Sequence, residues 1–220
     1  MNENITEIVA YADGACKNNN SHTKKRLGGC GFVIMAKNST ILDQFFANKI
    51  SLNALRTAML KSSDFTCMAV PMCEKIELPN KFSNNRAELE AFNGVLAHVL
   101  QSGHIEQKKI ALTIKLDSEY VIKVFNGAWS WRKNGWKISS GTVAANIDYI
   151  IEMIAFVEAL KRRGHMITVC HVMAHQTEPS KDVQQKWLDW FFNDFADRLS
   201  NIAAQVETDI NYNAKKRKRK

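Results

Sequence analysis

Four acidic residues lie where acids are uncommon and where several together could do chemistry. Asp13 and Asp117 each follow an apolar stretch with the pattern of a strand. Glu88 lies four residues before Phe92 on the apolar side of an expected helix, and Asp197 lies on the inward side of another. One such acid is usually a helix cap or an ion-pair partner. Four of them indicate a shared task, because acids avoid half-buried positions.

If the four carboxyl groups converge, they predict a site for divalent cations. Like charges at short range raise one another's pKa values and destabilise the fold, and a bound cation removes that cost. Oxygen ligands without a matching His or Cys cluster favour Mg²⁺ or Mn²⁺ over zinc. Two such ions about 4 Å apart suit in-line attack on a phosphodiester. The sequence positions alone leave open whether the four groups meet in space.

The elements that must position these acids alternate along the chain. Strands are predicted at 7–13, 109–117 and 165–175, and a hairpin is predicted from 27–36 and 40–50. Helices are predicted at 84–101, from residue 118 onward, at 142–163 and at 187–205. A hairpin followed by alternating helices and strands favours a mixed α/β sheet with helices on both faces.

Residues 51–82 fit this alternation poorly and are predicted to be an insertion. Residues 53–61 have a helical pattern, whereas Pro71 and Pro79 interrupt the second half. The 220-residue chain contains three prolines and no Gly/Ser-rich linker, which favours a single domain. We therefore expect one catalytic domain over 1–206, followed by a basic tail.

The formal net charge of +8 is concentrated at the C-terminal end. The six residues 215–220 are all Lys or Arg, and without them 24 of the 30 basic residues remain against 22 acidic ones. The tail 207–220 is predicted to be disordered, and it could bind phosphates, act as a nuclear localisation signal or aid solubility.

Other bulk features exclude some classes of protein. No run of about eighteen apolar residues occurs, and the N-terminal segment is polar and acidic, so neither a membrane span nor a secretory signal is expected. The five cysteines are scattered, which favours reduced thiols over a disulfide or zinc framework. We expect an intracellular chain, nuclear or cytoplasmic.

Five segments, in order, resemble the type 1 ribonuclease H family. They are YADGAC (11–16), GGCGFVI (28–34), SNNRAELEAFNGVLAHV (83–99), LDSEYVIKVFNGAWSWRKNGWK (116–137), and MAHQT (173–177) followed by NDFADRLSNIAA (193–204). The resemblance spans about 6–206. It implies the ribonuclease H-like fold, a five-stranded mixed sheet with helices on both faces. The implied activity is endonucleolytic hydrolysis of the RNA strand of RNA–DNA hybrids, leaving 5′-phosphate and 3′-hydroxyl ends.

By this resemblance, Asp13, Glu88, Asp117 and Asp197 are ligands of two Mg²⁺ ions, for which Mn²⁺ can substitute. Asp13 would bridge both ions. Asp117 and Asp197 would hold the ion that activates water, and Glu88 would help hold the ion that stabilises the leaving oxygen.

His175 matches the family's mobile histidine, which would move a proton or assist product release. An ordinary surface-loop histidine is the alternative. Met173-Ala174 precede it where the family has Lys-Gly, and the loop between His175 and the last helix is longer than usual. A basic loop at 18–26 and the 51–82 insertion are further departures from the family pattern, and none of these removes an acid.

The resemblance also implies which residues contact a hybrid. Small polar groups would approach the minor groove, where the 2′-hydroxyls lie, from Cys16, Asn19, Asn84, Asn85 and Glu119. A basic, tryptophan-rich handle would contact phosphates and deoxyriboses with Trp131, Arg132, Lys133, Trp136 and Lys137. The alternatives are turn or cap duty for the asparagines and a buried aromatic hairpin for the handle.

Two other functions remain possible on the same fold. One is a non-catalytic nucleic-acid-binding module, although such a module should have lost some of the acids. The other is a different metal-dependent nuclease, such as an exonuclease or a resolvase, which the handle and the NNRAEL segment disfavour. The expected partner is an RNA–DNA hybrid, bound by a monomer, and no protein partner can be inferred.

Overall fold

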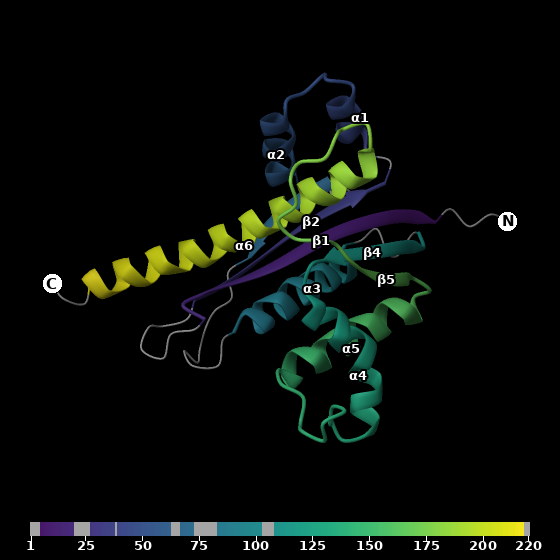
Figure 1. Cartoon of the computed structure of the whole chain (residues 1–220), viewed down its shortest axis with the longest axis vertical. Helices are drawn as coiled ribbons and strands as arrows, with labels where there is room; N and C mark the ends of the chain where they lie inside the picture. The colour runs from purple at the N-terminus through teal and green to yellow at the C-terminus, as the bar shows by residue number, and fades with distance from the viewer. Residues whose placement is uncertain are drawn as a thin grey trace.

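A five-stranded mixed sheet forms the centre of the protein in the computed structural model (Figure 1). The structure describes residues 5–19, 27–37, 39–62, 67–72, 83–102 and 108–217, with side chains up to residue 205. The strands are β1 (Thr6–Lys17), β2 (Leu27–Ala36), β3 (Cys67–Met72), β4 (Ile110–Leu116) and β5 (Met166–His171). Their order is β3-β2-β1-β4-β5, so β1, which carries Asp13, lies at the centre.

The strand pairing confirms the predicted mixed sheet. β1 pairs antiparallel with β2 and parallel with β4, while β2–β3 is antiparallel and β4–β5 is parallel. The parallel strands β1, β4 and β5 therefore point the same way. This brings Asp13, within β1, and Asp117, just after β4, toward the same end of the sheet.

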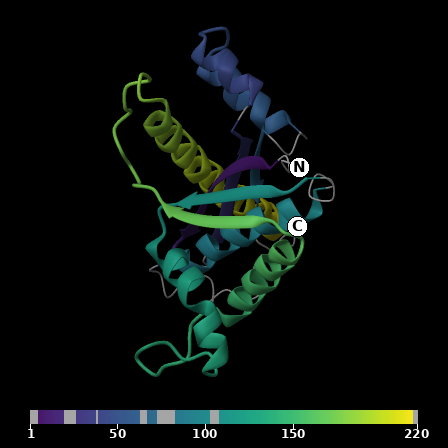
Figure 2. The ribbon, with the colours of Figure 1, turned by 90° about the vertical axis from the view of Figure 1, so that its right-hand side faces the viewer.

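Helices cover both faces of the sheet (Figure 2). They are α1 (Thr40–Phe46), α2 (Leu52–Lys61), α3 (Asn84–Gln101), α4 (Glu119–Lys133), α5 (Ile147–Arg162) and α6 (Gln184–Arg217). α3, α4 and α5 pack on one face, and α1, α2 and α6 pack on the other. Alternate residues of a strand face opposite sides, so Ile34 of β2 joins the first core and Val33 joins the second.

The predicted hairpin of 27–36 with 40–50 is wrong in its second half. β2 spans 27–36 as predicted, but 40–46 forms α1, and β2 pairs with β1 and β3. The apolar residues at 41, 42, 45 and 46 recur one turn apart, which suits a helix, and Leu42 and Phe45 are buried.

The insertion predicted at 51–82 also needs correction. Its first part is α2, as the pattern indicated, but 67–72 forms β3, a strand of the central sheet. Pro71 does not break this strand, because β3 lies at the edge of the sheet and an edge strand tolerates the missing N–H. Residues 40–61, which contain α1 and α2 and lie between the paired strands β2 and β3, are called the helical insert below.

Other boundaries shift by a few residues. α3 matches its predicted range, α5 begins at Ile147 instead of 142, and β5 ends at His171 instead of 175. α6 extends to Arg217 and so includes most of the tail 207–220, for which the composition predicted disorder; no Gly or Pro interrupts this helix. The basic loop prediction at 18–26 falls mostly outside the described residues. Among the residues described, no helix is long and apolar enough to cross a membrane.

Candidate active site

Asp13 and Glu88 come together because β1 and α3 touch at a glycine. A Cβ on Gly14 would lie 2.1 Å from the carbonyl carbon of Ala87, so only glycine permits this approach. The backbone N of Gly14 donates a 3.2 Å hydrogen bond to Glu88 Oε2. Asp13 and Glu88 are each only 7% exposed. Two acids 75 positions apart in the chain thus share one buried location.

Two further glycines let α6 approach β2 on the opposite face. A Cβ on Gly29 would lie 2.2 Å from Ala204 N, and one on Gly31 would lie 2.4 Å from Leu199 Cβ. The contact places Ser200 against the centre of the site. Its Oγ lies 2.5 Å from Asp13 Oδ2 and 2.8 Å from the backbone oxygen of Asp197, so its single proton can go to either acceptor.

Two asparagines of α6 orient the remaining acids. Asn193 Nδ2 donates a 3.3 Å hydrogen bond to Asp117 Oδ2, and Asn201 Nδ2 donates a 3.1 Å bond to Asp197 Oδ1. Asn193 lies four residues before Asp197, Ser200 three residues after it and Asn201 four residues after it. This is the spacing of residues on one face of a helix. No role was expected for any of the three from the sequence, although this spacing was a usable signal.

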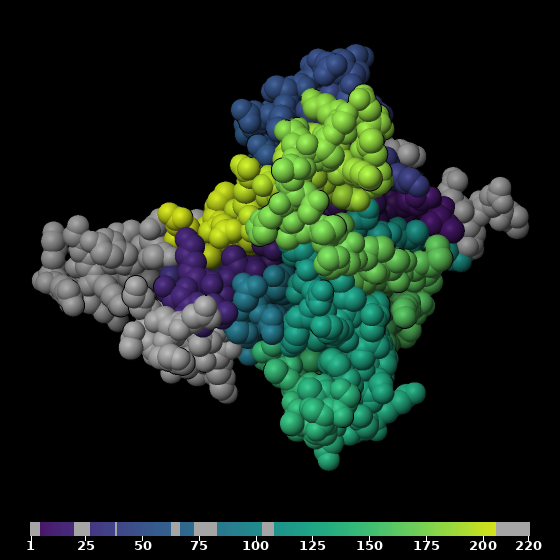
Figure 3. Space-filling model, in the orientation of Figure 1, coloured from purple at the N-terminus to yellow at the C-terminus, as the bar shows by residue number. Residues whose placement is uncertain are grey.

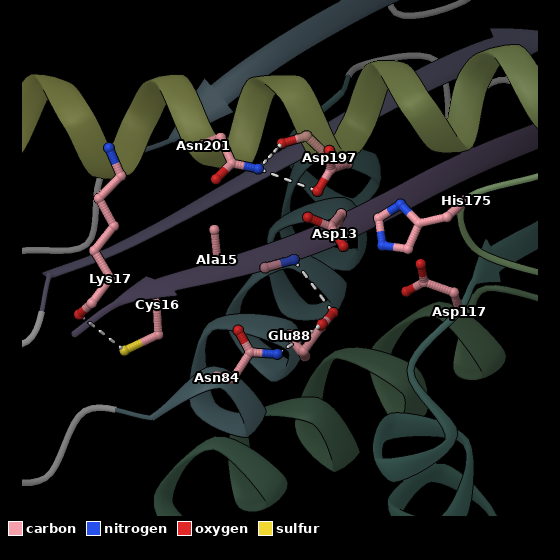
Figure 4. Close-up of a pocket in the computed structure, with 11 residues that line it drawn as sticks. Asp13, Ala15, Cys16, Lys17, Asn84, Glu88, Asp117, His175, Asp197 and Asn201 are labelled. Carbon is pink, nitrogen blue, oxygen red and sulfur yellow. Dashed lines mark hydrogen bonds between the residues drawn. The ribbon is translucent and has the colours of Figure 1, made fainter. Parts of the chain in front are cut away.

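The four predicted acids line one cavity of about 390 Å³ (Figure 4). Single carboxylate oxygens of Asp13, Glu88 and Asp117 lie within 4.8 Å of one another. Asp197 lines the same cavity from α6 but lies outside this close group of three. His175 completes the rim beside Asp13 and Asp117. The structure therefore brings together all five residues that were expected to be catalytic.

Burial raises the pKa values of three of these carboxyl groups, those of Asp13, Glu88 and Asp197. Burial raises the pKa of Asp13 to about 7; the Ser200 hydrogen bond opposes the rise, and the charges of Asp117 and Asp197 add to it. Burial likewise raises the pKa of Glu88 well above its ordinary value, with further contributions from Asp13 and Asp117. The pKa of Asp197 is also raised, mainly by burial. Ionisation of Asp13, Glu88 and Asp197 is therefore less favourable in this cavity than in water.

The donor set fits a hard divalent cation. Mg²⁺ binds oxygen ligands at about 2.1 Å, so oxygens on opposite sides of one ion are separated by about 4.2 Å. The 4.8 Å limit on the three oxygens of Asp13, Glu88 and Asp117 is compatible with that span after small side-chain adjustments. A cation would also compensate the charge that burial now disfavours.

Comparisons with known proteins identify the family. The model of the RNase H family matches residues 65–205, which is more than half of the chain. The chain belongs to the RNase H family. The matched segment includes Glu88, Asp117, His175 and Asp197, whereas Asp13 precedes it. The family model therefore covers four of the five candidate catalytic residues, and the structure places the fifth, Asp13 of β1, in the same cavity.

Curated RNase H proteins show the same relationship. Ribonuclease HI of Streptomyces coelicolor is 29% identical over 129 residues, covering 58% of this chain and 46% of that protein. Ribonuclease H of Lachnoclostridium phytofermentans is 30% identical over 104 residues, covering 46% of this chain and 58% of that protein. The chain thus spans about half the length of these two relatives. Ribonuclease H of Caldicellulosiruptor saccharolyticus is 24% identical, with 79% of this chain and 88% of that protein covered.

Solved structures of low sequence identity share the RNase H fold. LC9-RNase H1, described as a type 1 RNase H with the type 2 active-site motif, gives a TM-score of 0.59 at 18% identity and covers 92% of this chain and 74% of its own. The RNase H domain of PFV gives a TM-score of 0.58 at 17% identity, covering 92% of this chain and 96% of its own. The predicted fold class is therefore confirmed.

The residues expected at the minor groove lie at different distances from the RNase H acids. Cys16 and Asn84 line the acidic cavity, and Asn84 Nδ2 donates a 3.4 Å hydrogen bond to Glu88 Oε1. Asn19 Oδ1 accepts from the backbone N of Asn84, so it caps the start of α3. Asn85 is exposed beside it. Glu119 starts α4 outside the cavity lining and forms a 3.3 Å ion pair with Lys123.

The handle residues gather at the end of α4, away from the acids. The side chains of Trp131 and Trp136 are partly buried against the core, while Arg132, Lys133 and Lys137 are exposed. Arg132 is engaged in a 2.8 Å ion pair with Glu158 of α5. The two tryptophans are thus partly structural, and the two exposed lysines present their charges to solvent.

Proposed function

We propose that this protein cleaves the RNA strand of RNA–DNA hybrids endonucleolytically, leaving 5′-phosphate and 3′-hydroxyl ends, with two divalent cations that are Mg²⁺ in the cell. The convergence of Asp13, Glu88 and Asp117 in one cavity with Asp197 and His175, in a chain of the RNase H family, carries the proposal. The carboxylates are desolvated and mutually repulsive, which favours a site that is complete only with cations.

The acids and their neighbours would divide the work as follows. Asp13, Glu88, Asp117 and Asp197 would hold the two cations, which when bound lower the pKa of water and neutralise charge on the phosphate. Mn²⁺, with similar ligand preferences, would substitute. The partly buried hydrogen bond from Asn193 to Asp117 and the buried one from Ser200 to Asp13 would keep the carboxylates oriented.

His175 would act from the rim of the cavity. Its imidazole is exposed to solvent and lies beside Asp13 and Asp117. An imidazole in this place can accept a proton from one side of the cavity and exchange it with bulk water, or assist departure of the cleaved strand.

Hybrid recognition would use two surfaces of the described chain. Cys16 and Asn84, within the cavity lining, would contact the strand that is cut, and Asn19, Asn85 and Glu119, outside that lining, would contact the minor groove beside it. The handle would contact the other strand through Lys133 and Lys137. A structural neighbour with a TM-score of 0.51, a foamy viral protease-reverse transcriptase, was solved in complex with an RNA/DNA hybrid. We assign the catalytic domain to 1–206.

The experiment presents labelled RNA–DNA hybrid, double-stranded RNA and double-stranded DNA to the protein in Mg²⁺, in Mn²⁺ or in EDTA. Cutting is expected only in the RNA strand of the hybrid, and EDTA should abolish it. Asp117→Asn serves as the matched inactive variant, because the change removes charge and keeps shape. Equal cutting of double-stranded RNA, or cutting that survives EDTA, would refute the proposal.

A further inference from the structure

The loop that carries His175 has few internal supports. Residues 172–183 connect β5 to α6 without helix or strand, and most of their side chains are exposed. His175 itself has a φ of +50°, in the left-handed region that non-glycine residues rarely adopt. Such a conformation persists only where surrounding contacts hold it. The contacts that hold this loop therefore decide where the imidazole lies.

Two tryptophans of α6 hold the loop by their indole N–H groups. Trp190 Nε1 donates a 2.9 Å hydrogen bond to the backbone oxygen of Gln176, the residue after His175. Trp187 Nε1 donates a 3.1 Å bond to Glu178 Oε1. Trp187 is fully buried, so this anchor point is rigid.

The helical insert supports the same anchor from the other side. The ring of Phe45 in α1 stacks on Trp187 with a centroid separation of 4.8 Å. Lys181, from the loop, places its Nζ 4.7 Å from the centroid of Phe45 and 5.9 Å from that of Trp187. A cation over an aromatic face is attracted to it. Figure 3 shows the yellow-green segment that includes this loop lying against the blue insert.

The insert also reaches the flank of the acidic site through α2. The guanidinium of Arg56 lies over the ring of Phe191 at 5.1 Å and forms a 3.6 Å ion pair with Asp194. Asp194 lines a small cavity together with Asp117 and His175. The insert thus contacts both the loop of His175 and the helix that carries Asp197.

We propose that the helical insert, with Trp187 and Trp190, forms a clamp that positions the His175 loop, and that Trp190 and Lys181 are positioning residues that act through His175. The proposal rests on the proposed role of His175 in turnover. Trp190 holds the loop beside the histidine, and Lys181 ties the far end of the loop to the insert. Loss of either contact lets the imidazole leave its place at the rim.

Two substitutions test the clamp by steady-state cleavage of hybrid. Trp190→Phe removes the indole donor and keeps an aromatic ring, and it should lower kcat by about 3–10-fold with KM unchanged. Lys181→Met removes the cation and keeps the chain length, and it should lower kcat by about 2–5-fold. Lys161→Met is the matched control, because Lys161 Nζ lies 5.4 Å from the Trp129 centroid, away from the loop, and kcat should not change. A rise in KM together with a weaker salt dependence of KM for Lys181→Met would instead indicate a lost phosphate contact and overturn its role.

The His175→Ala background shows whether the effect passes through the histidine. In that background Trp190→Phe and Lys181→Met should cause no further loss of kcat, because the group that they position is gone. Additive losses would overturn the proposal.

Hydrogen exchange provides a readout that does not depend on activity. Phe45→Leu removes the ring that stacks on Trp187, and it should speed amide exchange in 173–183 with exchange in β1 and β4 unchanged. Unchanged exchange in the loop would refute the clamp even if the protein cuts hybrids. If the wild-type protein did not cut hybrids, the proposed function would fail, while this measurement would still decide whether the insert holds the loop.

Discussion

Asp13→Asn should make the cation-free protein more stable, although it should inactivate the site. The side chain is only 7% exposed, and its carboxylate shares a cavity with three other acids. Burial raises its pKa from an ordinary value of 3.8 to about 7, so ionisation of Asp13 opposes folding at neutral pH. Asn has the same shape without the charge, and its Oδ1 can still accept the Ser200 hydrogen bond.

The sign and size of the effect follow from proton linkage. Between pH 4 and 7 the folded protein keeps the Asp13 proton and the unfolded chain releases it, so stability falls as pH rises and the loss is complete above pH 7. At about 1.4 kcal/mol for each pH unit, a pKa raised from 3.8 to about 7 costs about 4 kcal/mol. We expect Asp13→Asn to recover about 2–4 kcal/mol of unfolding free energy at pH 8. The recovery is not always complete, because the amide packs less favourably than a protonated acid. At about 2–4 °C for each kcal/mol, Tm should rise by roughly 5–15 °C.

The assay is thermal unfolding in EDTA at several pH values from 4.5 to 8. The gain in Tm should be largest at pH 8 and should shrink toward pH 4.5, where Asp13 is protonated in the wild type. Mg²⁺ should stabilise the wild type more than the variant. Asp43→Asn, the same change at an exposed site on α1, should leave Tm nearly unaltered. A Tm for Asp13→Asn equal to or below that of the wild type at pH 8 would contradict the electrostatic reasoning.

Three further predictions concern activity and binding. Asp117→Asn should lower the rate of hybrid cleavage by several orders of magnitude with an unchanged circular dichroism spectrum, and near-normal turnover would disprove the metal assignment. Gly31→Ala should cost about 1–3 kcal/mol of stability and lower kcat, because its Cβ would lie 2.4 Å from Leu199 Cβ and 2.6 Å from the backbone N of Ser200, which pushes α6 away. Gly94→Ala should be milder, because its nearest neighbours are side-chain atoms of Met72 and Phe32, both at 3.1 Å, and no backbone atom. Lys133→Ala with Lys137→Ala should weaken hybrid binding and reduce its salt dependence with kcat preserved at saturation, and an unchanged salt slope would remove the handle from the interface.

Local patterns predicted most of the regular elements, and their failures have a physical cause. Helix α3 matched its predicted range because its apolar residues recur every three or four positions and Ser83 caps its start. Strand β4 alternates cleanly, with Ile110, Leu112, Ile114 and Leu116 all buried. Residues 40–46 were assigned to a strand, because a short apolar run fits either a helix or a strand. Residues 67–72 were assigned to no element, because Pro71 disfavoured a regular one. Pairing with β2, a contact between distant segments, decided that 67–72 is a strand.

The identity of the acids was readable from the sequence, since each follows a strand or lies on the inward face of a helix, and the ordered motifs pointed to one family. Their convergence was a tertiary outcome. It depends on Gly14 and Gly31 letting backbones meet, on hydrogen bonds from Ser200 and Asn193, and on a parallel strand order that no local pattern encodes. The contacts of Phe45, 130 positions before His175, with Trp187 and with Lys181 of the His175 loop were likewise invisible in the sequence. Stacking and cation–π contacts depend on distance in space and leave no periodic trace along the chain.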